Sequence, residues 1–177
     1  MTPDLDHWLA DPALRVAHRR ASHASAEALW EAAKQVKLSD AAVLGRLVRW
    51  RVPGTPPQIS FDEMFRSPPF TILLEEEMLL VSGLVGRIWT LRRDYPRLTS
   101  PDEFRDWSRP GTARVVLANW IEPGTGNGAT LVSETRVEAI GVQGRVGVAA
   151  VRPLVSAFQN VVASDGMAAV VRLAERR

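Results

Sequence analysis

Hydrophobic and polar positions repeat with two different periods along the chain, and the changes of period divide it into elements. Residues 15–23 alternate weakly, which predicts a first strand. One side of this strand carries Val16, His18, Arg20 and Ser22. The next stretch, SAEALWEAAKQV, begins at Ser25, a residue type that caps helices, and repeats its apolar residues at helical spacing. A second helix is predicted after Ser39-Asp40, with a stripe at Val43, Leu44, Leu47 and Val48.

Two capping boxes mark the starts of further short helices. Ser60 and Glu63 stand three residues apart, so each side chain is expected to bond the backbone N–H of the other. Ser100 and Glu103 repeat the spacing, with Pro101 at the first helical position. We expect a short helix after each serine.

Strand patterns occupy the middle of the chain. Residues 70–89 are too long for one ordinary strand and predict two, turning around Glu75–Glu77. Residues 112–121 and 129–141 flank the turn pair Asn127-Gly128, which predicts a β-hairpin.

The period becomes helical in the C-terminal third, from Pro153 onward. The stripe consists of Val155, Phe158, Val162, Ala169 and Leu173. The sequence SDG at residues 164–166 interrupts it, and glycine costs a helix about 1 kcal/mol against alanine. We expect either one long helix with a weak point there or two stacked helices.

The last strand, ATLVSETRVEAIG, has two unlike faces. One face carries Glu134, Arg136 and Glu138, and is expected to be an exposed ladder of charges. The opposite face carries Ser133 and Thr135 where apolar residues would pack better in a core. These two residues either bond locally across the hairpin or form part of a pocket wall.

Composition narrows the class of protein. The chain has 177 residues and no cysteine, so disulfides and thiolate chemistry are excluded. Its net charge is only +2, which indicates no basic patch for nucleic acid. No apolar run approaches the roughly 20 residues of a membrane span, and the first residues lack the pattern of a signal peptide. A cytoplasmic protein that binds no nucleic acid and does not span a membrane is expected.

No standard catalytic motif is present. The three histidines, His7, His18 and His23, lack the spacing of a metal site, so no metal and no cofactor are expected. Glu75–Glu77 are interpreted as a solvated strand end. The glycines of GLVGRIW, Gly83 and Gly86, indicate either curvature of the sheet or room for a ligand.

With these segments in place, the chain resembles the SRPBCC superfamily of START-like, polyketide cyclase-like helix-grip proteins, and an uncharacterised bacterial subgroup of it. The order of elements matches over about residues 14–175. The segments that carry the resemblance are SAEALWEAAKQV, FDEMFRSPPFTILLEE, GLVGRIW, FRDWSRPGTARVVLANW and LVSETRVEA. The resemblance implies an α+β helix-grip fold, in which a curved antiparallel sheet wraps around a long C-terminal helix, with two short helices after the first strand. We expect one START-like domain over residues 1–177, with residues 1–13 as an N-terminal extension.

The superfamily's cavity between sheet and helix implies a function in binding or carrying a small hydrophobic or amphipathic molecule. The residues expected to line it are Leu80, Ser82, Leu84, Leu117, Asn119, Ser133 and Thr135 on the strands, and Phe158 and Val162 on the helix. No catalytic residue is assigned.

Two alternatives stay open. One is a cyclase or dehydratase acting on a polyketide-like substrate, for which His18 and Arg20 are the available acid/base candidates. The other is a protein-interaction module, possible as a homodimer, that exposes an apolar patch around Trp8, Trp50 or Trp107.

Overall fold

The structure is a computed structural model, and it describes residues 2–41, 43, 46, 56–90, 95–124 and 126–176, without the side chains of residues 158, 159 and 163. The strands are β1 (Leu14–Ser22), β2 (Thr71–Glu76), β3 (Leu79–Gly86), β4 (Thr112–Pro123) and β5 (Ala129–Ile140). The helical elements are α1 (Ala26–Gln35), the 3-10 turn η1 (Leu38–Asp40), α3 (Phe61–Arg66), α4 (Pro101–Arg105), α5 (Gly141–Val161), the π-helical turn η2 (Val162–Gly166) and α6 (Met167–Ala174).

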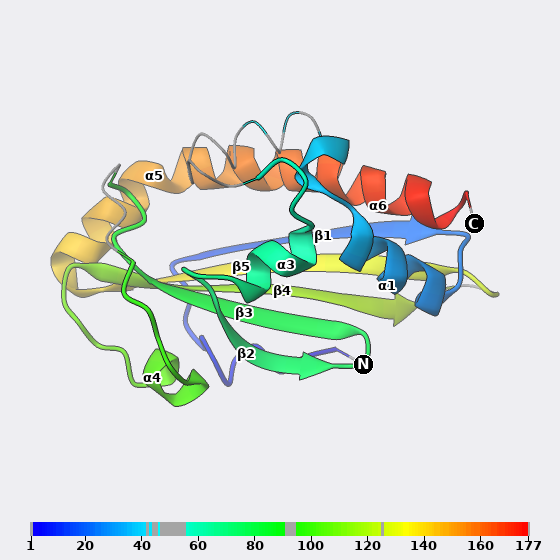
Figure 1. Cartoon of the computed structure of the whole chain (residues 1–177). Helices are drawn as coiled ribbons and strands as arrows, with labels where there is room; N and C mark the ends of the chain where they lie inside the picture. Colours follow the sequence, from blue (N-terminus) through cyan, green and yellow to red (C-terminus); the bar gives the residue numbers. More distant parts are fainter. Residues whose placement is uncertain are drawn as a thin grey trace.

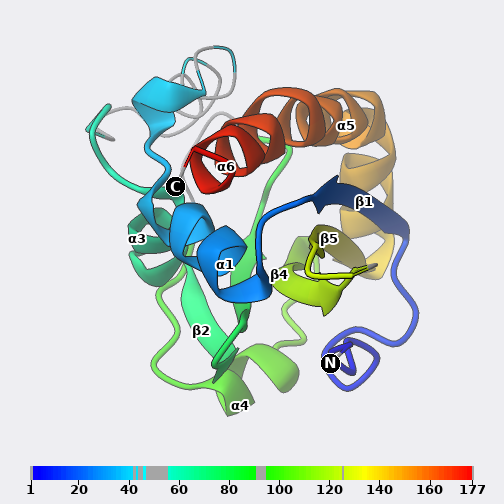
Figure 2. The same ribbon diagram turned by 90° about the vertical axis from the view of Figure 1, so that its right-hand side faces the viewer.

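The five strands form one antiparallel sheet in the order β1-β5-β4-β3-β2. Helices α1, α3, α5 and α6 cover one face of this curved sheet, which we call the inner face (Figure 1). Helix α4 and the residues before β1 lie on the opposite, outer face (Figure 2). The predicted α+β helix-grip architecture, with its long C-terminal helix packed across the sheet, is confirmed.

Helix α1 begins and packs as the sequence predicts. The Ser25 hydroxyl accepts a hydrogen bond from the backbone N–H of Ala28 at 3.3 Å, which satisfies one of the free donors of the first turn. Leu29 and Trp30 are buried against the inner face. Of the second predicted helix, Leu44, Leu47 and Val48 lie outside the described residues.

The two predicted capping boxes differ in one bond. At α3 both reciprocal bonds form, from Ser60 N–H to the Glu63 carboxylate at 2.9 Å and from Glu63 N–H to the Ser60 hydroxyl at 3.1 Å. At α4 the Ser100 hydroxyl caps Glu103 N–H at 3.3 Å, but the Glu103 carboxylate accepts from the N–H of Thr99 at 2.7 Å instead of Ser100. The predicted start of α4 is therefore confirmed, but the backbone N–H that the Glu103 carboxylate binds belongs to Thr99, one residue before the predicted Ser100.

Both predicted strand pairs are present. Strands β2 and β3 are joined by a turn at residues 77–78, and β4 and β5 form the long hairpin. The N–H of Gly124 donates to the carbonyl of Gly128 at 3.0 Å, which closes the loop next to Asn127.

The C-terminal helix begins at Gly141 and not at Pro153, so the predicted start was too late. Gly141 has φ of +73°, which lets the chain turn directly from β5 into α5. At Gly144 an added Cβ would lie 2.7 Å from the Thr112 carbonyl, so α5 contacts β4 more closely than a side chain permits. Glycines lower helix propensity, which hides this first part of the helix in the sequence. The predicted weak point at residues 164–166 coincides with the π-helical turn η2.

The outer face of the sheet is covered, contrary to the predicted exposed ladder. Leu5, Trp8 and Leu9 pack there in a buried cluster with the outward residues of β3, β4 and β5. Beneath this cover Glu134 is 5% exposed and Arg136 is 6% exposed. The expectation of a wet face was wrong because residues remote in sequence form a second layer over it.

An ion-pair network holds the N-terminal segment to the sheet. The guanidinium of Arg136 donates to the Glu134 carboxylate at 2.7 Å, to the Leu9 carbonyl at 2.9 Å and to the Asp6 carboxylate. Arg15 of β1 also binds the Glu134 carboxylate, at 2.9 Å. Each buried charge therefore has a partner, as burial of charges requires.

Asp6 makes the stability of this attachment depend on pH. Its hydrogen bond to Arg136 lowers the pKa of the Asp6 carboxyl below its usual value. A lowered folded-state pKa contributes stability above the unfolded pKa of about 4, and that stability is lost as the pH falls through the folded value. We expect Asp6→Asn to be less stable than the parent at pH 7, and the difference to shrink as the pH is lowered to 2, as measured by urea unfolding at both values. An equal difference at both values would contradict this assignment.

Candidate functional site

The strand register places the predicted cavity residues on the inner face. One row across β3, β4, β5 and β1 consists of Leu80, Asn119, Ser133 and His18. The next row consists of Ser82, Leu117, Thr135 and Val16. Leu84 belongs to a third row with Val115, Val137 and Leu14. All seven predicted strand positions therefore share the face that the helices cover.

Two apolar clusters lie at opposite ends of this face. Under α1 and α6, a cluster joins Leu80, Ile121 and Leu131 to helix residues such as Trp30 and Met167. Under α5, a second cluster joins the Leu84 row to Val148, with Trp89 and Val155 at its margin. A group of polar side chains lies between the two clusters, and we call it the polar band. The polar band consists of His18, Ser82, Asn119, Ser133 and Thr135.

The polar band contains buried atoms that lack a partner. Ser82 is 1% exposed, and its hydroxyl oxygen has no hydrogen-bond partner within the described residues. Nε2 of His18 is likewise buried and without a partner there, although the His18 side chain as a whole is half-buried. Thr135 differs, because it makes an interaction of its own. A buried hydroxyl without a partner is unusual and costs about 1–3 kcal/mol.

The helix residues predicted to roof the cavity are not both placed there. Val162 lies in η2 and packs against the cluster of Leu38 and Ala41. The side chain of Phe158 lies outside the described part of the chain. The strand half of the predicted site is thus brought together on one face. On the helix side, Val155, Ala169 and Leu173 of the predicted stripe pack against the inner-face clusters together with Val148 and Met167, which the sequence did not indicate.

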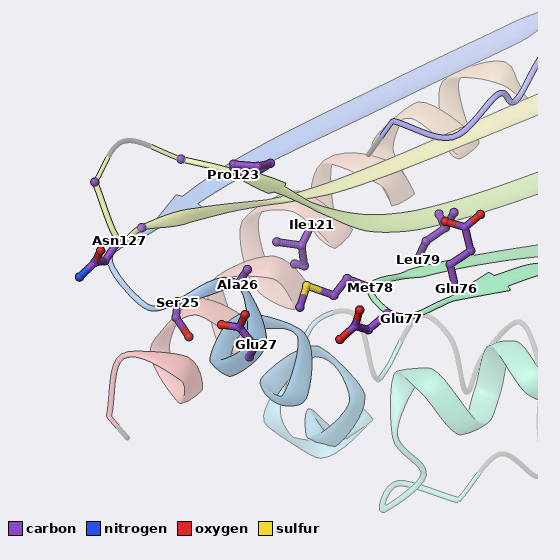
Figure 3. A pocket seen from close by; sticks show the side chains of 13 residues that line it. Ser25, Ala26, Glu27, Glu76, Glu77, Met78, Leu79, Ile121, Pro123 and Asn127 are labelled. Carbon is purple, nitrogen blue, oxygen red and sulfur yellow. The ribbon is translucent and has the colours of Figure 1, made fainter.

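A pocket that the sequence did not predict opens at one end of the sheet (Figure 3). It has a volume of about 480 Å³ and lies between the first turn of α1, the β2–β3 turn and the loop of the β4–β5 hairpin. We call it the end pocket. It is lined by residues 25–27, 76–79, 121, 123, 124 and 126–128. These three segments are far apart in sequence, so no local pattern indicates it.

The end pocket combines apolar residues with carboxylates. Met78 and Ile121 point into the space between α1 and the strands, and Pro123 borders it (Figure 3). Glu27 and Glu77 lie around it, whereas the side chain of Glu76 lies beside Leu79 and points away from it (Figure 3). The backbone N–H of Glu27 and the Ser25 hydroxyl lower the pKa of the Glu27 carboxyl, so this group is ionised at neutral pH. No basic side chain is among the lining residues.

Gly83 does not make room for a ligand on the inner face, which was one of the two roles expected for it. A Cβ built there would lie 2.8 Å from the ring of Phe104 and from Leu73 on the outer face. The glycine therefore makes room for α4 and not for a ligand on the inner face. Gly86 has φ of +142°, a conformation that favours glycine at the end of β3.

The patch proposed for protein interaction is not formed by Trp8. Trp8 is buried in the outer-face cluster, and Trp107 is half-buried with its indole N–H donating to Thr112 at 3.0 Å. Trp50 lies outside the described residues. Within the described ranges no three side chains of the His, Cys, Asp or Glu types are grouped to hold a metal ion. None of the helices described has the length and apolar character needed to cross a membrane.

Taken together, the fold and the inner face define an α+β helix-grip protein with a polar band between two apolar clusters. No protein-family model and no curated protein matches the chain. A hypothetical protein of Helicobacter pylori aligns with a TM-score of 0.44 and 7% identity, over 98% of this chain and 95% of that one. An aromatase/cyclase of a Streptomyces species aligns with a TM-score of 0.38 and 17% identity, over 93% of this chain and 94% of that one. Norcoclaurine synthase of Thalictrum flavum aligns with a TM-score of 0.36 and 10% identity, over 100% of this chain and 94% of that one. Similarities this weak assign no function.

Proposed function

We propose that the chain binds or carries a small hydrophobic or amphipathic molecule on the inner face of its sheet, between the strands and helices α5 and α6. The observation that supports this most is the hydroxyl of Ser82, which is buried without a partner in the described chain. A ligand group that bonds this hydroxyl would offset its cost, and the apolar clusters on either side would contact the ligand's apolar parts. The order of elements also supports membership of the SRPBCC superfamily as part of this proposal.

The residues assigned to the ligand are the strand positions of the inner face. Ser82, Asn119 and Ser133 would supply hydrogen bonds from three neighbouring strands. Leu80, Leu84 and Leu117 would contact apolar groups of the ligand. Since most small-molecule sites are apolar with a few placed polar groups, this composition fits such a ligand.

Ser82→Ala tests the proposal because stability and binding are expected to change in opposite directions. Removing an unpartnered buried hydroxyl raises the free energy of unfolding by about 1 kcal/mol. Losing a ligand hydrogen bond of similar size lowers affinity about fivefold. Native mass spectrometry of protein purified from its own host should show a bound small molecule in the parent and lower occupancy in the variant. Absence of any bound molecule in the parent, or equal occupancy in both, would overturn the proposal.

Ser22→Ala is the matched control. This serine is also buried, but its hydroxyl donates to the Glu175 carboxylate at 2.9 Å. Its removal therefore lowers the free energy of unfolding by about 1 kcal/mol, and ligand occupancy should stay at the parent value.

A second candidate function is favoured by His18. Its Nε2 is buried on the same face without a partner in the described chain, which is the placement an acid/base group needs. A cyclase or dehydratase reaction on a polyketide-like substrate would use that nitrogen for proton transfer. If so, the parent protein releases water from the molecule found by mass spectrometry, and His18→Gln binds the molecule without converting it. Conversion at an equal rate by His18→Gln would exclude this role.

A further inference from the structure

The end pocket is separate from the polar band. Its lining residues come from α1, the β2–β3 turn and the tip of the β4–β5 hairpin, and none of them belongs to the polar band. Ile121 and Met78 belong to the apolar cluster under α1, which stands between the two places. The end pocket therefore has to be considered as a site of its own.

The size and the apolar lining of the end pocket fit a small organic molecule. Its volume of about 480 Å³ lies within the roughly 300–1,000 Å³ of small-molecule sites. Ile121 is buried and Met78 is half-buried, so both present apolar surface that a bound molecule would shield from water. Methionine adapts to ligands of different shape because its side chain is unbranched and polarisable.

The charged side chains among the lining residues of the end pocket are all acidic. Glu75, the neighbour of two lining residues, is held by Arg66 through two hydrogen bonds of 2.9 and 2.8 Å. Glu77 has no hydrogen bond or ion pair to a side chain in the described parts of the molecule. Glu27 and Glu77 therefore give the pocket a negative potential, and no Lys or Arg is among its lining residues.

We propose that the end pocket binds organic cations that carry an apolar body, such as alkylammonium ions. The apolar body contacts Met78, Ile121 and Pro123, and the cationic group lies beside the carboxylates of Glu27 and Glu77. Because these carboxylates are exposed, water and salt screen their attraction, so the charge selects the ligand class and apolar contact supplies much of the affinity.

A matched set of probes tests this assignment. Hexylammonium, hexanol and hexanoate share one apolar chain and differ in charge. Each is titrated into the whole protein while NMR follows the signals of Ala26, Met78 and Ile121. Hexylammonium should shift these signals at the lowest concentration and hexanoate at the highest. Equal affinity for all three probes, or shifts spread over the whole surface, would overturn the proposal.

Variants separate the effect of these carboxylates from that of net charge. Glu77→Gln should weaken hexylammonium binding about two- to fivefold. The control Asp102→Asn removes one negative charge on α4, on the outer face of the sheet (Figure 1), and should leave affinity at the parent value. Circular dichroism checks that both variants fold. Unchanged affinity in Glu77→Gln would overturn the proposal, whereas absence of a co-purified molecule would overturn only the function proposed for the inner face.

Discussion

Arg136→Met is expected to lower the free energy of unfolding by about 3 kcal/mol, because removing one member of a buried ion pair leaves its partner charge uncompensated. Arg136 donates to Glu134, to Asp6 and to the carbonyl of Leu9, so one substitution removes every bond that it makes to the N-terminal segment. Glu134 keeps its bond to Arg15 in the variant, so we expect the loss of unfolding free energy to lie at the lower end of the roughly 3–5 kcal/mol found when a buried ion pair is broken. Urea unfolding followed by tryptophan fluorescence measures the change.

Two comparisons make this result specific. Arg19→Met removes an exposed pair with Glu122 on the same outer face and should cost less than about 1 kcal/mol. Glu134→Leu/Arg136→Met replaces both buried charges by apolar side chains and should recover most of the lost stability. A single variant Arg136→Met that unfolds at the parent's urea concentration would show that the network does not hold the segment.

Phe104→Ala is expected to lower the free energy of unfolding by about 3–5 kcal/mol. Phe104 of α4 is fully buried, and its ring lies against Gly83 in the outer-face cluster. Truncation of a buried aromatic residue removes its apolar contacts and leaves a cavity. Phe65→Ala, at a half-buried ring on α3, is the control and should cost about 1–2 kcal/mol. A loss for Phe104→Ala no larger than that of the control would contradict the packing described.

The contact between Phe104 and Gly83 can be measured by a double-mutant cycle. Gly83→Ala alone places a methyl group 2.8 Å from the ring and from Leu73, and overpacking of this kind costs about 1–3 kcal/mol. In Gly83→Ala/Phe104→Ala the ring is absent, so the double variant should lose less than the sum of the single losses. Strict additivity would show that the two positions do not touch.

The sequence predicts the inner face well because the face depends on local pattern. Period-two alternation fixes which residues of a strand point the same way, and the loop between Pro123 and Ala129, which contains Asn127 and Gly128, joins the two paired strands of the long hairpin. Ser133 therefore lies opposite Asn119, and Thr135 opposite Leu117, as the prediction of a common face requires. The ligand assigned to these residues stays a prediction.

The parts that the sequence did not predict depend on contacts between remote segments. Burial of Glu134 and Arg136 requires residues 5–9, and nothing within β5 indicates that cover. The available signal was the spacing of Leu5, Trp8 and Leu9, which matches one face of a helical turn. The end pocket likewise requires three segments to meet, which only the assembled sheet and α1 achieve.

The attachment of the N-terminal segment also has a consequence for the order of folding. Asp6 and its partner Arg136 are 130 positions apart in the chain, and contacts of such separation form late because the loop between them must close first. During synthesis Leu5, Trp8 and Leu9 have no hairpin to pack on until β5 has left the ribosome. Leu5, Trp8 and Leu9 are made before β5 and are thus among the last of the described residues to reach their final place, and their apolar side chains stay accessible to chaperones until then.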